Sequence, residues 1–125
     1  MPRFLLCLFA AVFAAACAGP PRPPSMFGDI PLPPELTLSE KDSRVFEHEI
    51  GRVGLLKASG RLSRENVLNF YRQGMAQNGW SEAGEFDSGA SRMLVFSKTP
   101  RSAAVTVTEG WMSTDVEINV SAKKE

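Results

Sequence analysis

The sequence predicts an α+β domain of two layers, in which one amphipathic helix packs on an antiparallel sheet in the order β-β-α-β-β-β-β. Two observations lead to this fold class. One stretch repeats its apolar residues with the period of a helix and has both ends marked, whereas six others alternate apolar and polar residues as half-buried strands do. The chain has 125 residues, which is enough for one small domain.

The helix is predicted to begin after Ser63, a residue type that favours the N-cap position. Leu62 and Val67 have the spacing of a hydrophobic staple around that cap, and Glu65 suits the positive end of the helix dipole. At about 100° per residue, the apolar side chains form one stripe that covers less than half of the circumference. That stripe contains Val67, Leu68, Phe70, Tyr71 and Met75.

Two features indicate how this helix packs and where it ends. Gly74 lies within the apolar stripe, where the missing side chain permits close approach to a sheet at a cost of about 1 kcal/mol. Asn78-Gly79 supplies residues that readily take the left-handed conformation at a helix C-terminus. We therefore expect an amphipathic helix on one face of a sheet.

The strands of the sheet are predicted from period-two alternation. In the last of them, Val116, Ile118 and Val120 share one face, and polar residues occupy the other. Such clean alternation is typical of antiparallel strands with one solvated face. Gly51-Arg52 is the expected connection between the first two strands. The predicted strands cover residues 44–50, 53–62, 80–86, 93–98, 103–108 and 115–120.

The chain divides into three parts: a signal peptide over residues 1–16, a cysteine with a proline-rich tether over 17–36, and the folded domain over 37–123. Residues 1–16 combine one early positive charge, Arg3, with an apolar run from Phe4 to Ala16, which is the layout of a secretory signal. The run is too short for a membrane-spanning helix, which needs about 20 residues.

The tether follows from the distribution of proline, because residues 18–36 hold seven of the nine prolines. Proline at this density excludes regular helix or sheet and favours an extended spacer, of about 50 Å from Ala18 to Pro34 at about 3.1 Å per residue. Four apolar side chains near its end are able to dock on the domain. They are Met26, Phe27, Ile30 and Leu32.

Composition excludes several classes of function. The 14 basic and 14 acidic residues balance to a formal net charge of zero, so no electrostatic footprint for nucleic acid is present. The only cysteines are Cys7 and Cys17, which leaves the folded region without an intrachain disulfide. A single histidine, His48, offers no basis for a metal cluster, and we predict neither a metal nor a cofactor.

Candidate catalytic residues have simpler structural explanations. His48 has the side chain of a general base, but alternation turns it away from Glu47 and Glu49, and we interpret it as a strand histidine on a half-exposed sheet. Glu47 and Glu49 share a face, and only Glu117 on a distant strand would complete an acid–base set with them, so we interpret them as part of a solvated strand face. No nucleophile motif is present, so we expect a protein that is not an enzyme.

Trp111-Met112 is the most conspicuous feature outside the expected core, because it places two large apolar side chains in a hairpin loop. One interpretation is a contact for a protein partner or for the membrane interface, both of which suit tryptophan. The other is a loop folded back over the edge of the sheet. The sequence leaves both interpretations open.

The N-terminus resembles a bacterial lipoprotein precursor, whose lipobox is seen here as Ala14-Ala15-Ala16-Cys17. The resemblance implies cleavage between Ala16 and Cys17 and attachment of a diacylglyceryl group, usually with an N-acyl chain, to Cys17. Ala18 after the cysteine implies retention in the outer membrane, facing the periplasm, if the envelope is Gram-negative. Ordinary signal peptidase offers a competing cut, because Ala16-Cys17-Ala18 also satisfies its small-residue rule.

The globular part resembles small uncharacterised envelope lipoprotein domains in one helix pattern. The pattern is Phe70, Tyr71, Met75, Gly79 and Trp80, which in those domains belongs to a helix packed on a sheet. It carries no known activity.

Together these observations predict a lipid-anchored, non-enzymatic cell-envelope lipoprotein that acts as an accessory or protein-interaction module. Its expected partners are the membrane, through the lipid anchor, and an envelope protein. The alternative is a soluble periplasmic domain that binds a small ligand in a pocket between helix and sheet.

Overall fold

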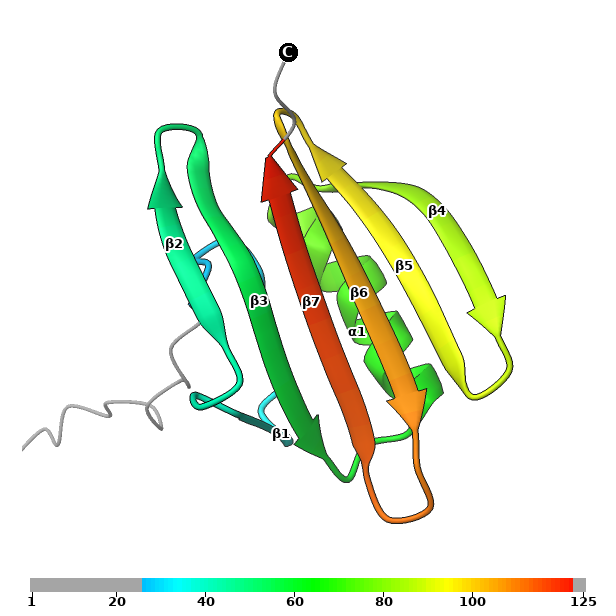
Figure 1. Cartoon of the computed structure of the whole chain (residues 1–125). Helices are drawn as coiled ribbons and strands as arrows, with labels where there is room; N and C mark the ends of the chain where they lie inside the picture. The colour runs from blue at the N-terminus through cyan, green and yellow to red at the C-terminus, as the bar shows by residue number, and fades with distance from the viewer. Residues whose placement is uncertain (1–25, 123–125) are drawn as a thin grey trace, which may run out of the picture.

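A computed structural model describes residues 26–122 of the chain. Seven strands form one antiparallel sheet in the order β1-β3-β7-β6-β5-β4, with β2 also paired to β3 (Figure 1). One helix, α1, lies on one face of this sheet. The elements are β1 (Leu36–Leu38), β2 (Arg44–His48), β3 (Gly51–Gly60), α1 (Arg64–Gln77), β4 (Ser81–Ser88), β5 (Ser91–Lys98), β6 (Arg101–Glu109) and β7 (Thr114–Ala122).

The predicted α+β class is wrong, because the described chain is mainly β. Strands make up 54% of it and the single helix 14%. The sequence pattern did not reveal β1, which is three residues long and pairs with the end of β3. Only Leu36 of this strand falls within the predicted tether, and three residues are too few to show the alternation of a strand.

The helix occupies the segment that its end signals predicted. The Ser63 side chain accepts a hydrogen bond from the Asn66 amide at 3.2 Å, as an N-cap does. At the other end, Gly79 has a φ of 87°, and the Trp80 amide donates to the Met75 carbonyl at 3.0 Å. These contacts satisfy backbone groups that a helix leaves unpaired at its ends.

The connection between β2 and β3 differs from the expected one. His48 pairs with Gly51, so the two-residue turn consists of Glu49-Ile50 rather than Gly51-Arg52. Strands β1 and β2 lie one after the other along the same edge of β3. The buried hydroxyl of Ser43 holds this junction together by donating to the Ser39 carbonyl at 2.6 Å and accepting from the Lys57 amide at 3.0 Å.

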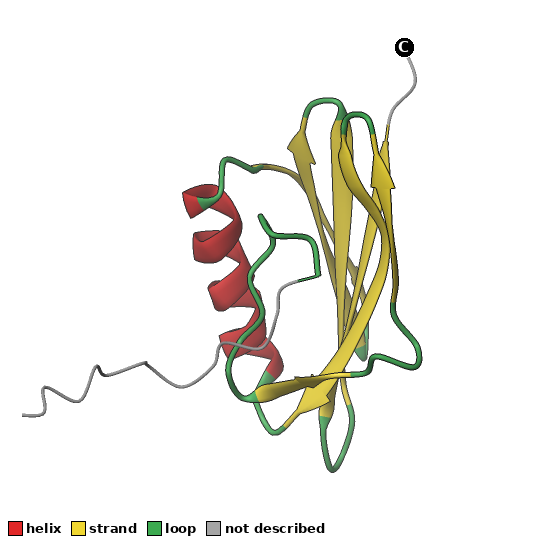
Figure 2. Cartoon of the chain, turned by 90° about the vertical axis from the view of Figure 1, so that its left-hand side faces the viewer, coloured by secondary structure: helices red, strands yellow, loops and turns green. Residues whose placement is uncertain are grey.

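The core lies on the inner face of the sheet, where alternate residues of β6 and β7 are buried. The helix covers the half of this face formed by β5, β6 and β7 (Figure 1). Residues 26–35, which we call the strap, lie beside the helix and cover the half behind β2 and β3 (Figures 1 and 2). Phe27 and Ile30 of the strap are 4% and 1% exposed, so the expected docking of the tether's end on the domain is confirmed.

Candidate functional site

Trp111 and Met112 lie at the tip of the β6–β7 hairpin, which projects beyond the end of the sheet (Figure 1). The Gly110 amide donates to the Ser113 carbonyl at 2.8 Å and closes the loop. Trp111 is 94% exposed and Met112 60%, so the loop does not fold back over the sheet edge. Two large apolar side chains in this position are available for contact with another surface.

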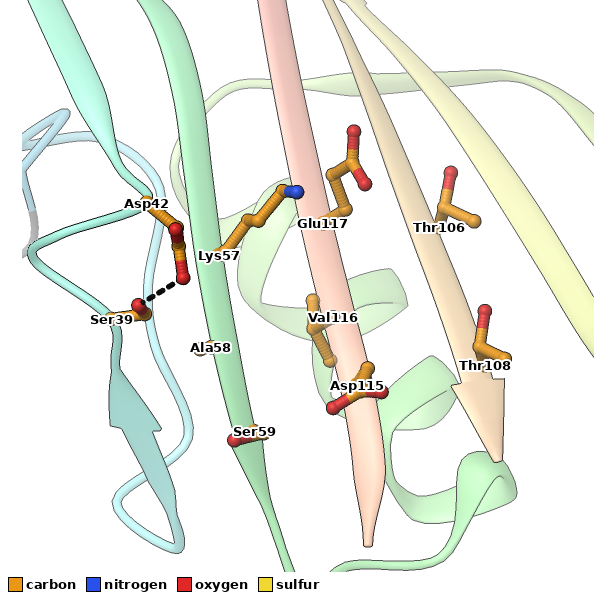
Figure 3. A pocket seen from close by; sticks show the side chains of 10 residues that line it. All are labelled: Ser39, Asp42, Lys57, Ala58, Ser59, Thr106, Thr108, Asp115, Val116 and Glu117. Carbon is orange, nitrogen blue, oxygen red and sulfur yellow. Dashed lines mark hydrogen bonds between the residues drawn. The ribbon is translucent and has the colours of Figure 1, made fainter. Parts of the chain in front are cut away.

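The outer face of the sheet carries a polar groove of about 410 Å³ (Figure 3). Lys57 of β3 is paired in register with Glu117 of β7, but no ion pair joins the two within the described residues. The Ser39 hydroxyl donates to Asp42 at 2.8 Å on the groove's rim. The lining residues are Ser39, Asp42, Lys57, Ala58, Ser59, Thr106, Thr108, Asp115, Val116 and Glu117.

This groove provides hydrogen bonds and charge but no activated nucleophile. Thr108 shares a 2.6 Å hydrogen bond with Ser91, and neither hydroxyl contacts a histidine in the described structure. The groove lies on the face opposite to the helix, because its polar strand residues alternate with the buried positions of β3, β6 and β7. It is therefore distinct from the helix–sheet pocket that the small-ligand alternative predicted.

The helix–sheet interface itself is densely packed. Val67, Leu68, Tyr71 and Met75 each have 0% exposure. The Tyr71 hydroxyl has no hydrogen-bond partner among the described residues, and burial raises the pKa of this phenol. Tyr71 accordingly serves the core as a large apolar ring.

A polar cluster lies where the strap meets the β5–β6 end of the sheet. The Asp29 carboxylate accepts a hydrogen bond from Lys98 Nζ at 2.9 Å and is also bound by the Arg101 guanidinium. The Trp80 indole donates to the Asp29 carbonyl at 3.0 Å. The two cations lie over the Trp80 ring, at 5.8 Å for Lys98 and 5.0 Å for Arg101. We call these four residues the Asp29 cluster.

Electrostatics stabilise the charged form of this cluster. Partial burial raises the pKa of Asp29, but the hydrogen bonds and charges of Arg101 and Lys98 outweigh it and hold that pKa below its usual value. The Arg101 side chain is only 9% exposed, and its other hydrogen bond goes to the Arg52 carbonyl at 3.2 Å. Asp29 is therefore the counterion of a nearly buried cation.

The sequence did not reveal the Asp29 cluster. Lys98 and Arg101 follow Asp29 by 69 and 72 residues, and no local pattern pairs them. The available signal was weak: one of two acids in the strap, next to the apolar Ile30, and two cations flanking a turn that contains proline.

The carboxylates of the acid–base alternative do not come together. Glu47 is bonded to Arg52 at 2.9 Å at the edge strand β2, whereas Glu117 belongs to β7 on the far side of β3. On β3, Glu47 is paired with Arg52 and Glu117 with Lys57. Paired residues point to the same face, and Arg52 and Lys57 are an odd number of positions apart, so the two carboxylates face opposite sides of the sheet. Exposed His48 accepts a hydrogen bond only from the Ile50 amide, at 3.4 Å, among its described contacts.

Three further points concern the N-terminus, metal binding and membrane-spanning helices. Cys17, Ala16 and the signal peptide lie outside the described residues. Within residues 26–122, no group of three or more His, Cys, Asp or Glu side chains is placed to hold a metal ion. In the same part of the chain, no helix combines the length and the apolar character needed to cross a membrane.

A family model of START domain-like proteins matches residues 56–125, from the middle of β3 onward. The chain belongs to this START domain-like family. Searches of curated proteins and of solved structures gave no match. Family membership is compatible with a small-ligand-binding domain, and the matched region contains Trp80, Lys98 and Arg101 but not the strap.

Proposed function

We propose that this START domain-like protein is a non-enzymatic binding module, held at the cell envelope by a lipid on Cys17. The observation that carries the proposal is the docked strap, which joins the N-terminal segment to the domain core through Phe27 and Ile30. Between Cys17 and the docked strap lie residues 18–25, which cannot span more than about 29 Å even when fully extended. This spacer is shorter than the 50 Å expected from proline content alone.

The anchor would keep the domain permanently close to the bilayer. Each buried acyl methylene contributes about 0.8 kcal/mol, so two or three chains are sufficient for stable attachment. In a Gram-negative envelope, the proposed site is the periplasmic side of the outer membrane. Within that arrangement, Trp111 and Met112 are the proposed contact with an envelope protein, because the β6–β7 hairpin presents them to solvent.

Mass spectrometry of the mature N-terminus tests the anchor directly. We expect the wild-type chain to begin at Cys17 with the mass of a diacylglyceryl group and an N-acyl chain, and the Cys17→Ser variant to lack both. A wild-type N-terminus that begins unmodified at Gly19 contradicts the anchor.

Crosslinking in native membranes tests the contact surface. A photoreactive residue at position 111 is expected to give a discrete protein adduct, whereas the same residue at exposed position 73 on α1 should not. Equal adducts at both positions would contradict a specific role for the tip.

A soluble periplasmic small-ligand-binding domain is the second candidate, and membership in the START domain-like family favours it. It differs from the first in the fate of Cys17, since ordinary signal cleavage would leave the mature protein without a lipid. Both candidates assign the domain a binding role.

A further inference from the structure

Strand β4 forms one edge of the sheet (Figure 1). Within residues 26–122, β5 is the only strand that pairs with it. Alternate residues of an edge strand turn their N–H and C=O groups away from the sheet, where a further strand is able to pair with them. Proteins often block such an edge with proline or lysine, and β4 contains neither.

The second half of β4 has the most regular geometry. Ala83 is an extra residue between the paired Glu82 and Gly84, and a bulge of this kind interrupts the ladder. From Gly84 to Ser88 the pairing with β5 continues in register as far as the hairpin turn. Residues 84–88 therefore offer an uninterrupted template for an added strand.

The outer face of this template is apolar. Phe86 is 58% exposed and is paired in register with half-buried Met93, and Gly84 is paired with half-buried Val95. The Phe86 ring lies against Gly84, since a Cβ there would be 3.5 Å from the ring. An added strand would cover Phe86 with apolar side chains of its own, as aromatic and β-branched residues do in cross-strand pairs.

The inner face of the same strand is acidic. Glu82, Glu85 and Asp87 have side chains that are 42%, 41% and 55% exposed. The cations that bind them come from other elements: Arg72 of α1 lies 2.9 Å from Glu85, and Arg92 of β5 lies 3.1 Å from Asp87. Because β4 supplies three acids and no base, basic side chains on an added strand would meet partly exposed carboxylates.

The surrounding charges do not cancel this excess. Arg64, which donates to the Gly89 carbonyl at 2.8 Å, adds a cation near Asp87, and Glu65 adds an acid 3.5 Å from Arg92. The group then has four acids and three cations and is negative at neutral pH. Its members are Glu65, Glu82, Glu85, Asp87, Arg64, Arg72 and Arg92.

We propose that the free edge of β4 binds an extended segment of a partner protein by strand addition, and that this segment alternates basic and apolar residues. Its basic side chains would face the acids of β4, and its apolar side chains would face Phe86. This inference rests on the proposal that the protein is a binding module. It uses a surface other than Trp111 and Met112 and does not require the lipid anchor.

Charge argues against a second copy of this chain as the occupant. Two copies related by a two-fold axis would join their β4 strands antiparallel, with the same faces of the sheets aligned. The register that pairs residues 84–88 completely with themselves places Glu85 of one copy opposite Asp87 of the other. Like charges directly opposite one another destabilise a strand pair.

The opposite edge of the sheet lacks the same complementarity. Strand β2 also has an exposed phenylalanine, Phe46, at 61%. Its charges are mixed, however, because it carries Arg44 and because Glu47 is bonded to Arg52 at 2.9 Å. A basic strand is therefore expected at β4 and not at β2.

The test uses the chain from Cys17 onward, with Cys17→Ser to exclude lipidation, which contains every described residue. The probe is a short synthetic peptide of alternating lysine and valine, capped at both ends and labelled for fluorescence anisotropy. We expect saturable binding, and slower amide exchange by NMR at alternate residues of Gly84–Ser88. Alternating glutamate and valine should not bind, and neither should the same lysines and valines arranged in two blocks.

Two further peptides test backbone pairing on the unaltered protein, so this test does not depend on the folding of a variant. One carries N-methyl groups on every valine, and the other carries them on every lysine. Alternate N–H groups of a strand point to opposite edges, so only one of the two peptides loses its pairing donors. We expect that peptide to lose binding and the other to keep it. Equal binding of both would overturn strand addition.

Charge is tested with variants on two strands. Glu82→Gln with Glu85→Gln should weaken binding of the lysine–valine peptide about threefold to tenfold, the range for partly exposed ion pairs. The matched control removes two exposed acids of the central strand β7, Asp115→Asn with Glu117→Gln, and should leave the affinity unchanged. An equal loss in both variants would mean that the peptide senses only net charge.

The apolar contact is tested in the same assay. Phe86→Ser should weaken binding about fivefold, whereas Phe46→Ser on β2 should not. Trp111→Ala should also have no effect, so failure of the hairpin tip as a contact can be distinguished from failure of the β4 edge. A loss confined to Phe46→Ser, or slower exchange at β2 alone, would overturn the assignment to β4. Protection of β4 that rises with protein concentration in the absence of peptide would make a second copy the occupant.

Discussion

The two halves of the sheet's inner face are covered in different ways. Under α1 the cover is a regular element, whose backbone groups are satisfied by its own hydrogen bonds and whose ends are capped. Under the strap the cover is an irregular segment, held by four apolar side chains, of which Phe27 and Ile30 are fully buried, and by one polar cluster. Both halves contain buried side chains, yet the first is built locally and the second depends on contacts between residues about 70 positions apart.

This difference implies unequal responses to mutation. The helix is fixed along its length, so a cavity beneath it cannot collapse easily, whereas the strap can settle into a cavity. The strap should also be the part that opens first, because few of its backbone groups are paired in regular structure.

Truncation beneath the helix should have the largest effect. Leu68→Ala removes a side chain with 0% exposure, and we expect a loss of about 3–5 kcal/mol in the free energy of unfolding. Urea denaturation measures it, with exposed Asn69→Ala as the matched control on the same helix. A loss below about 1 kcal/mol would show that the helix is not tightly packed.

Truncation in the strap should cost less. Ile30 is 1% exposed, and we expect Ile30→Ala to lose about 2–3 kcal/mol, at the lower end of the usual range for isoleucine. The loss should appear in hydrogen exchange mainly at β3, which the strap covers. Uniform acceleration over α1 and β3 would instead make strap and helix a single cooperative unit.

Neutralising the polar cluster should have a smaller effect that depends on pH. We expect Asp29→Asn to lose about 1–2 kcal/mol at pH 7, since charge-assisted hydrogen bonds contribute more than neutral ones and the site is partly exposed to solvent. The pKa of Asp29 is lower in the folded state. Its stabilisation is therefore present above the unfolded pKa of about 3.9 and disappears as the pH falls through the folded value.

Chemical denaturation from pH 7 down to pH 2 measures this dependence. The wild type and the variant should converge in stability at the acidic end. A constant difference across the whole range would mean that the Asp29 charge does not contribute.

Adding one methyl group at Gly74 should disturb the packing between α1 and the strap. A Cβ at Gly74 would lie 2.8 Å from Cγ of Pro31 in the strap. The helix gains up to about 1 kcal/mol from alanine, but the rigid proline ring must move, so we expect Gly74→Ala to lose about 1 kcal/mol overall. Thermal unfolding would measure this loss of stability, with Gln73→Ala at an exposed position of the same helix as the control. A net stabilisation would contradict close packing of the strap.

The smallest effect should come from a residue that lies outside both halves of the inner face. Trp111 is 94% exposed, so Trp111→Ala should change the free energy of unfolding by less than about 0.5 kcal/mol. Trp80→Ala, at a buried tryptophan, should lose about 3–5 kcal/mol in the same assay. A comparable loss at both positions would make the hairpin tip a structural element.

Local signals were sufficient to predict the helix, since its cap at Ser63 and its stop at Asn78-Gly79 involve neighbouring residues. Alternation likewise predicted most strands and the solvated face of β7. The expected α+β class was wrong because a single helix covers only part of a seven-stranded sheet, which makes the described chain mainly β. Strand β1 escaped prediction because three residues give no measurable period.

What the sequence determined by itself is the set of features encoded within a few residues: helix ends, strand faces and an apolar pair in a hairpin loop. Only the tertiary structure decided that the strap completes the core, that Asp29 meets Lys98 and Arg101, and that Trp111 stays in solvent. The physical reason is the separation along the chain between the residues that interact. Hydrogen bonding and side-chain periodicity act between neighbours, whereas a buried cation and its counterion are brought together only when the whole sheet has formed.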